Sequence, residues 1–177
     1  EGAVAVGEGG PTLEQLEADT LATIRADEER ITLGFQHDGS GLFVRAGTIK
    51  AHLKDCANQL QTVVGVKNFR SKLANAVFVE PDRLSLARRD DPAAIETEDG
   101  EFERPVHVMT AMGPRNALKR IRYIEQPLIT CHLRVLDPSE LTEKRLRMIL
   151  EYGGVHGYGG ERGMGEGRYD FSLEAMD

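Results

Sequence analysis

A run of glycines near the end of the sequence separates side chains that can bind phosphate, stack on a base or transfer a proton. Residues 151–169 read EYGGVHGYGGERGMGEGRY. Glycine inside a helix or strand costs about 0.5–1 kcal/mol relative to alanine, so this density is expected where the backbone takes positive φ or lies against a ligand. Arginine can pair with phosphate, and histidine can act as a general acid or base. The run therefore predicts a ligand-binding loop, or otherwise a plain connector on the surface.

The binding interpretation gives separate roles to the glycines and arginines of this run. Gly163, Gly165 and Gly167 are expected to let the backbone approach a phosphate or ribose closely. Arg162 and Arg168 are expected to supply charge-assisted hydrogen bonds to phosphate oxygens. These residues form the first half of a predicted nucleic-acid site.

The same run offers one candidate for catalysis. His156 is the only histidine that we consider as a general acid–base for RNA cleavage, because it stands beside the glycines and Tyr158. The alternative for a lone histidine at a helix end is a capping or packing role. The histidines form no HExxH motif, and no Cys/His spacing typical of zinc is present, so neither a metal nor a cofactor is expected.

The chain is acidic, with a formal net charge of −7 over 177 residues, and its charges are segregated. Acidic residues concentrate in residues 14–29 and 90–103. A net negative charge argues against an indiscriminate nucleic-acid binder. Basic residues nevertheless gather in two segments, which predict either local phosphate sites or the solvated faces of amphipathic elements.

The two basic segments supply the second half of the predicted site. In the first, Lys50 and Lys54 lie one turn apart on a helix expected to begin with Thr48 as its N-cap. Backbone N–H groups at a helix N-terminus also favour anions. In the second, basic residues follow the strand breaker Met112-Gly113-Pro114 and are expected to lie on a projecting hairpin. The site residues of both segments are Arg45, Thr48, Lys50, Lys54, Arg115, Lys119 and Arg120.

The hydrophobic pattern predicts an α+β fold in which strands and helices alternate. The order of the elements is the βαββαβ pattern of a ferredoxin-like antiparallel sheet. To this pattern the sequence adds an N-terminal helix, an inserted acidic loop and a basic hairpin. Strands are expected over residues 31–35, 42–44, 76–79, 106–110, 118–123, 128–135 and 169–173, and helices over residues 12–27, 48–64 and 137–153.

Length and composition favour one compact domain. Residues 1–30 are predicted to form a mobile tail and the N-terminal helix, and residues 31–177 a single domain. No apolar run reaches the length of a membrane span, and no signal segment is recognisable. We therefore expect a cytoplasmic protein with no membrane partner.

Two segments resemble motifs of a known family. The RAMP superfamily of CRISPR-associated RNA-binding proteins has a glycine loop that resembles residues 159–169, GGERGMGEGRY. Its backbone-type members commonly read Gly-Ser-x-x-Lys-Gly before their first helix, which is similar to residues 44–54, VRAGTIKAHLK. The resemblance implies a ferredoxin-like fold that grips a guide-RNA backbone while copies stack along the RNA. The residues that it implies in phosphate or backbone contacts are Arg45, Thr48, Lys50, Lys54, Gly163, Gly165, Gly167 and Arg168.

Three kinds of function follow from these observations. The first is a nucleic-acid-binding subunit, with RNA favoured over DNA, that grips the phosphate backbone and assembles with copies of itself or within a larger complex. The second is an endoribonuclease of the same superfamily, which needs a working base. The third is a structural assembly protein, such as a virion component, in which acidic and basic surfaces of neighbours pair. A virus-encoded relative of the family with another nucleic-acid partner is a further alternative.

Overall fold

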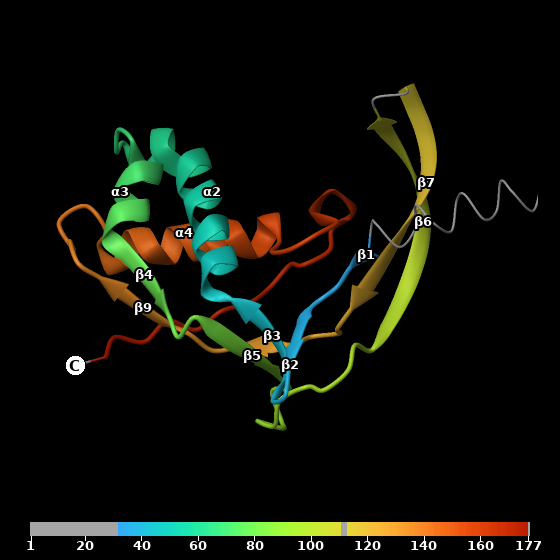
Figure 1. Ribbon diagram of the computed structural model, residues 1–177. Helices are drawn as coiled ribbons and strands as arrows, with labels where there is room; N and C mark the ends of the chain where they lie inside the picture. The colour runs from blue at the N-terminus through green and yellow to red at the C-terminus, as the bar shows by residue number, and fades with distance from the viewer. Residues whose placement is uncertain (1–31, 111–112, 177) are drawn as a thin grey trace, which may run out of the picture. The chain divides into compact units, whose positions relative to one another are not determined.

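The computed structural model describes residues 32–110 and 113–176 (Figure 1). The chain divides into two compact units. We call Glu1–Gly34 with Glu98–Glu125 the hairpin unit, and Phe35–Thr97 with Gln126–Asp177 the helical unit. The predicted tail and N-terminal helix lie outside the described residues, and a single domain over residues 31–177 stays a prediction.

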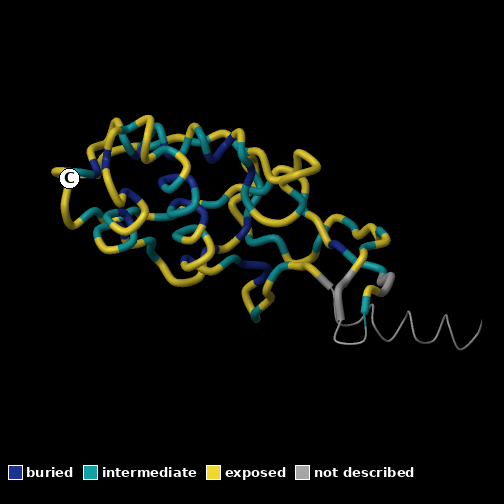
Figure 2. The backbone as a smooth tube through the Cα atoms, turned by 90° about the horizontal axis from the view of Figure 1, so that it is seen from above, coloured by how far each residue is buried: buried dark blue, intermediate teal, exposed yellow. Residues whose placement is uncertain are grey.

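The helices described by the structure belong to the helical unit, and its three α-helices share one hydrophobic core. Leu53 from one helix, Phe69 from the next and Ile149 from the last are all buried in it. Figure 2 shows the buried residues along the backbone in dark blue, and all buried hydrophobic residues described except Ile121 belong to this unit. The helices are α2 (Ala46–Val64), α3 (Phe69–Ala76), α4 (Glu143–His156) and the short 3₁₀-helix η1 (Arg162–Met164).

Helix α2 begins at Ala46, so Thr48 lies inside the first turn and is not the N-cap that its residue type predicts. The N–H of Ala46 is already bonded to the carbonyl of Asp82 at 2.8 Å, which starts the helix earlier. The Thr48 hydroxyl instead donates to the carbonyl of Arg45 at 2.7 Å. At the other end Gly65 takes φ 70° and its N–H bonds to the carbonyl of Gln61, which ends the helix.

Helix α4 also differs from its predicted bounds. It begins at Glu143, and its N-cap is Thr142, whose side chain accepts a hydrogen bond from the N–H of Arg145. The predicted start at Asp137 forms a turn, because this carboxylate accepts from the N–H and the hydroxyl of Ser139. The helix then continues through Gly153 and Gly154 to His156 instead of ending at the glycines.

The strands of the helical unit form two small antiparallel sheets. The first has the order β2-β3-β5-β8, and the second pairs β4 with β9. In Figure 1 the pair β4 and β9 lies beneath α3 and α4. The strands are β2 (Gln36–Asp38), β3 (Gly41–Arg45), β4 (Val77–Glu80), β5 (Arg83–Ala87), β8 (Leu128–Ile129) and β9 (His132–Val135).

The hairpin unit contains the predicted hairpin. Its strands β6 (Gly100–Thr110) and β7 (Gly113–Tyr123) pair in register from one end to the other, and β1 (Thr32–Leu33) lies parallel to β7. The turn falls at the predicted breaker, where Gly113 takes φ 106°. The hairpin is not purely basic, because Glu103 lies opposite Arg120 and their side chains approach to 2.8 Å.

The predicted α+β class with antiparallel sheets is confirmed, whereas the ferredoxin-like order is not. The predicted closing strand over residues 169–173 does not form. Instead the N–H of Tyr169 donates to the carbonyl of Gly154, and the carbonyl of Leu173 accepts from Arg147. The segment therefore lies along α4 and does not pair at a sheet edge. No helix in the described part of the chain has the length and apolar character to cross a membrane.

Candidate functional site

The glycine-rich loop folds back onto the first turns of α2. The Tyr158 and Thr48 hydroxyl oxygens lie 2.6 Å apart, and the Tyr169 hydroxyl lies 3.0 Å from Nε2 of His52. Nη1 of Arg162 lies 3.3 Å from Oδ2 of Asp55. Since the α2 partners are spaced i, i+4 and i+7, they occupy one face of the helix. We call these residues the loop–helix surface: Thr48, His52, Asp55, Tyr158, Arg162 and Tyr169.

This arrangement joins the two segments that sequence analysis singled out. Because the single proton of the Thr48 hydroxyl is donated to the carbonyl of Arg45, Tyr158 must be the donor in the contact between the two hydroxyl groups. Burial raises the pKa of Tyr158, which keeps this donor protonated. The two motifs therefore meet through a directed hydrogen bond across 110 residues of sequence.

The loop is closed at its base by backbone hydrogen bonds. The N–H of Tyr158 donates to the carbonyl of Gly167 at 2.7 Å, and the N–H of Tyr169 donates to that of Gly154 at 3.2 Å. Between these bonds the chain turns through η1, at whose end Met164 is exposed. The loop is thus held at both ends and presents its tip outward.

The glycines of the run fall into two groups. A Cβ at Gly153 would collide with the Tyr169 hydroxyl, and a Cβ at Gly154 would lie 2.5 Å from the carbonyl oxygen of Tyr169. Gly167, at φ 72°, faces the carbonyl of Tyr158 with no room for a side chain. By contrast, a Cβ at Gly163 would meet nothing within 4 Å. The packing therefore requires glycine at positions 153, 154 and 167, but it does not require glycine at position 163.

The three glycines predicted to approach a ligand therefore differ in role. Gly165 has open space around it but takes φ 87°, so an alanine would be strained there. Gly167 is fully explained by the turn that closes the loop. Gly163 has neither a positive φ nor a close neighbour, and nothing in the packing of the described residues requires a glycine there.

His52 lies at the centre of the loop–helix surface. Only 8% of the residue is exposed, and its ring meets those of Tyr158 and Tyr169 edge-on at 5.5 and 5.7 Å. Burial, with a smaller contribution from the nearby His156 and Arg162, lowers the pKa of His52 to about 4. Burial also raises the pKa of the Cys56 thiol to about 11 and that of the Tyr169 hydroxyl. All three groups are neutral near pH 7 and hold the loop through packing and a hydrogen bond.

A charged cluster lies at the rim of this surface. Nη1 of Arg162 lies 2.9 Å from Nε2 of His156, and Oδ2 of Asp55 lies 3.6 Å from that nitrogen. The His156 ring also stacks on Tyr152 at 5.5 Å. Since guanidinium can only donate, Nε2 of His156 accepts in this contact. In the described part of the chain, no group of three or more His, Cys, Asp or Glu side chains could hold a metal ion.

The predicted cations differ in their partners. Arg45 bonds to Gln36 and lies 3.4 Å from Asp82. Lys50 lies over the ring of Phe78, with its ammonium nitrogen 4.4 Å from the ring centroid. Within the residues that the structure describes, neither Lys54 nor the exposed Arg168 has an acidic side chain within ion-pair distance.

The cations predicted on the hairpin lie on β7, in the other unit. Nη2 of Arg120 bonds to Glu103 at 2.8 Å, and its Nε lies 3.8 Å from Glu101. Lys119 also has an interaction partner within the chain. The side chain of Arg115 lies outside what the structure describes. The charge of Arg120 is therefore matched by acids of the same hairpin.

The α2 partners of the loop, His52 and Asp55, were not predicted as site residues from the sequence. The available signal was their spacing from Thr48, which places all three residues on one helix face. The sequence also contained a matching set of hydrogen-bonding side chains in Tyr158, Arg162 and Tyr169. What it could not show was that the two sets pair.

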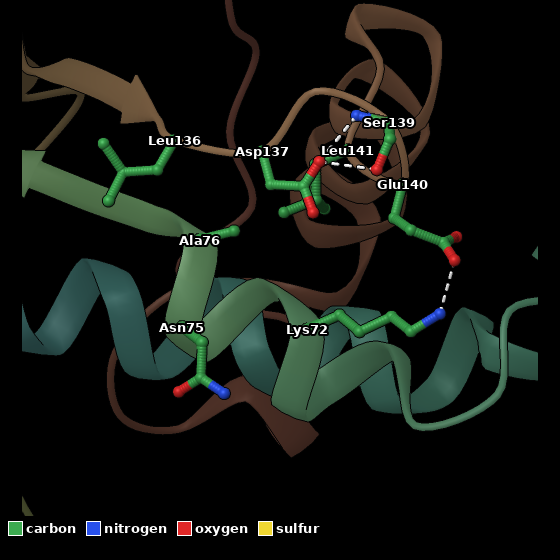
Figure 3. A pocket seen from close by; sticks show the side chains of 8 residues that line it. All are labelled: Lys72, Asn75, Ala76, Leu136, Asp137, Ser139, Glu140 and Leu141. Atoms are coloured by element: carbon green, nitrogen blue, oxygen red, sulfur yellow. Dashed lines mark hydrogen bonds and ion pairs between the residues drawn. The ribbon is translucent and has the colours of Figure 1, made fainter.

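A pocket elsewhere in the helical unit contains no comparable arrangement (Figure 3). Lys72 from α3 bonds to Glu140, and Asp137 bonds to Ser139, so these polar groups satisfy one another. The hydrogen bonds from Ser139 hold the pKa of Asp137 below its usual value. We therefore assign the candidate site to the loop–helix surface.

Alanine at Gly167 and alanine at Gly163 are predicted to have different effects on stability. Gly167→Ala should lower the free energy of unfolding by at least about 1 kcal/mol, because left-handed backbone is unfavourable for a residue with a Cβ. Gly163→Ala should leave it within about 0.5 kcal/mol of the unsubstituted chain, as is usual for surface substitutions. Urea denaturation of both variants measures this difference. Equal losses of unfolding free energy in the two variants would mean that the loop is packed differently.

Acid should weaken the packing of the loop through His52. Because the folded-state pKa is about 4 and the ordinary value is 6.5, the unfolded chain binds more protons between these values. The contribution of neutral His52 to the free energy of unfolding is complete above pH 6.5. It is lost as the pH falls toward 4, which lowers this free energy by up to about 3 kcal/mol. Denaturation at several pH values should show that the free energy of unfolding falls less steeply with decreasing pH in His52→Gln than in the unsubstituted protein. Parallel curves would contradict a buried, neutral His52.

Comparison with known proteins adds no family assignment. No protein-family model matches this chain, and no curated protein matches it significantly. The resemblance of its two motifs to those of the RAMP superfamily therefore stays a prediction.

Proposed function

We propose that the loop–helix surface binds the sugar–phosphate backbone of a single-stranded nucleic acid, RNA in preference to DNA. The observation that carries this proposal is the contact between Thr48 and Tyr158, which joins the start of α2 to the glycine-rich loop. The exposed tip of the loop, at Gly163, lies in open space where a backbone can approach. Both segments were expected to touch phosphate before their proximity was known.

The charges around α2 support a path for the strand. By the periodicity of the helix, the exposed small residues Gly47 and Ala51 lie between Thr48 on one side and Lys54 on the other. The first turn of α2 contains no acidic residue and no side-chain cap, so its N–H groups other than that of Ala46, which bonds to Asp82, favour an anion. A phosphate chain crossing this strip of helix would meet the loop on one side and the lysines on the other.

A ferredoxin-like origin of the helical unit and self-assembly belong to the same proposal. The sequence of β3 followed by α2, and of β9 followed by α4, supports two strand–helix halves whose helices share one core. In the described residues β6 pairs only with β7, so its other edge is open to a strand from a second copy. Stacking of copies along a bound strand would use such an edge.

RNA cleavage is a second candidate function, favoured by one observation. His156 lies beside Asp55 and Arg162, which could orient the ring and stabilise charge on a phosphorane. To act as a base, Nε2 of His156 would first have to lose its bond from Arg162. Products that appear with the unsubstituted protein and are absent with His156→Ala would favour this function over binding alone.

Reversing two charges tests the binding proposal. Replacement of Lys50 and Lys54 by glutamate should weaken binding of a single-stranded RNA and flatten the plot of log K against log salt. Each phosphate contact with a single strand contributes about −0.7 to this slope, so two lost contacts change it by about 1.4. Fluorescence anisotropy over a series of salt concentrations measures both quantities, and DNA of the same sequence tests the preference for RNA.

The matched control is the double variant Lys67→Glu with Arg70→Glu. Both side chains are exposed, lie beyond the opposite end of α2 and change the net charge by the same amount. This variant should keep the original slope. If both double variants change the affinity and the salt slope equally, only the total charge matters. If the Lys50 and Lys54 variant folds and binds RNA normally, α2 is not part of the site.

The loop tip gives an independent test. Gly163→Ala should weaken RNA binding several-fold while the melting temperature stays unchanged, because the added methyl blocks the approach of a backbone without straining the chain. Affinity and melting temperature are measured on the same preparation. Gly159 is the control, since it also has open space but takes φ 94°, so its alanine variant should lose stability. Normal binding by Gly163→Ala would remove the loop tip from the site.

A further inference from the structure

We propose that Phe78 is a stacking platform for an unpaired base of the strand that α2 binds. This inference rests on the proposed function, which concerns only the phosphate backbone. It adds a contact to the base, through a residue that neither sequence motif contains. Its position follows from strand β4, which lies in the second sheet of the helical unit (Figure 1).

Phe78 occupies the outward position of its strand. Its neighbours Val77 and Val79 belong to the hydrophobic core or pack against it, as alternate residues of a half-buried strand do. Phe78 faces the other way, and 39% of it is exposed. A single exposed phenylalanine is common on protein surfaces, so exposure alone does not assign a role. The surroundings of the ring make the assignment.

One cation contacts the ring, and a second lies opposite Phe78 on the paired strand. Nζ of Lys50 lies 4.4 Å from the centroid of Phe78, which is the geometry of a cation–π contact. Arg134 lies directly across the strand pair from Phe78, and its exposed guanidinium bonds to Glu80 at 2.9 Å. An aromatic ring beside lysine and arginine is the combination with which proteins hold single strands, the ring under a base and the cations at phosphates.

The ring also lies on the expected path of the strand. Lys50 contacts Phe78 and belongs to the same helix face as Lys54, on the side of Gly47 and Ala51 away from the loop. A nucleotide whose phosphate reaches Lys50 therefore brings its base next to the ring. Because every base has an aromatic face, stacking here adds affinity without selecting a sequence, in agreement with backbone recognition at the loop.

The absence of tryptophan from the sequence makes this contact directly measurable. In Phe78→Trp the new indole is the only one in the protein, and stacking of a base on it should quench its fluorescence. We compare an RNA oligonucleotide with an abasic oligomer of the same length and charge. The RNA should quench the indole strongly, and the abasic oligomer should leave it nearly unchanged while still binding.

The control tryptophan replaces Val63, which is 72% exposed and lies on α2 roughly 20 Å along the helix from Lys50. Its fluorescence should not distinguish the two oligomers. Phe78→Leu should lower the affinity for RNA by roughly fivefold to a hundredfold, the range for one lost stacked base, and leave the affinity for the abasic oligomer unchanged. Phe78→Tyr should retain binding, and melting temperatures confirm that each variant is folded.

The outcomes separate the two proposals. If the unsubstituted protein binds neither oligomer, the proposed function fails and the stacking platform fails with it. If it binds both, but Phe78→Leu binds RNA normally and the indole responds equally to both oligomers, only the stacking platform is overturned. Phe78 would then serve to support Lys50 within the fold. Equal losses for both oligomers in Phe78→Leu would likewise assign the ring to the positioning of Lys50.

Discussion

The loop–helix surface depends on the absence of two Cβ atoms. Gly153 and Gly154 lie inside α4, where glycine is unfavourable, and they let Tyr169 approach the helix more closely than any larger residue would allow. That approach brings the Tyr169 hydroxyl to His52. The helix thus gives up some intrinsic stability at these positions, and the packing of a tyrosine between two helices offsets the loss.

Ion pairs within the chain reduce the number of basic side chains that are free of a carboxylate partner and so available to a ligand. An acidic protein has many carboxylates available, and Arg45, Arg120 and Arg162 each lie beside one. Exposed ion pairs of this kind contribute only about 0–1 kcal/mol, so a phosphate can compete for such an arginine. The lysines of α2 require no such exchange, so in the proposed binding of a nucleic-acid strand they are the first contacts expected.

Periodicity and turn chemistry were sufficient to predict several elements. The alternating residues around Gly113 predicted the hairpin, and the apolar stripe through Leu53 predicted α2. Other elements carried too weak a local signal: α3 has eight residues, and its N-cap Asn68 takes φ 57°. The glycines at 153 and 154 were misleading, because their usual meaning as helix terminators was overridden by tertiary contact with Tyr169. For the same reason the site was predicted as two separate motifs, since no local pattern shows which distant residues will pair.

The long sequence separation within the loop–helix surface sets the order in which it can form. Thr48 and Tyr158 are 110 residues apart, and His52 and Tyr169 are 117 apart. Closing loops of this length carries a large entropic cost that must be met before the contacts form. During synthesis, the face of α2 that receives the loop is fully covered only after residue 169 has left the ribosome. The surface is therefore completed late, after the core around α2 and α3 can already have formed. A chain interrupted before Tyr158 would contain α2 without its partner loop, and one interrupted between Tyr158 and Tyr169 would lack the contact to His52.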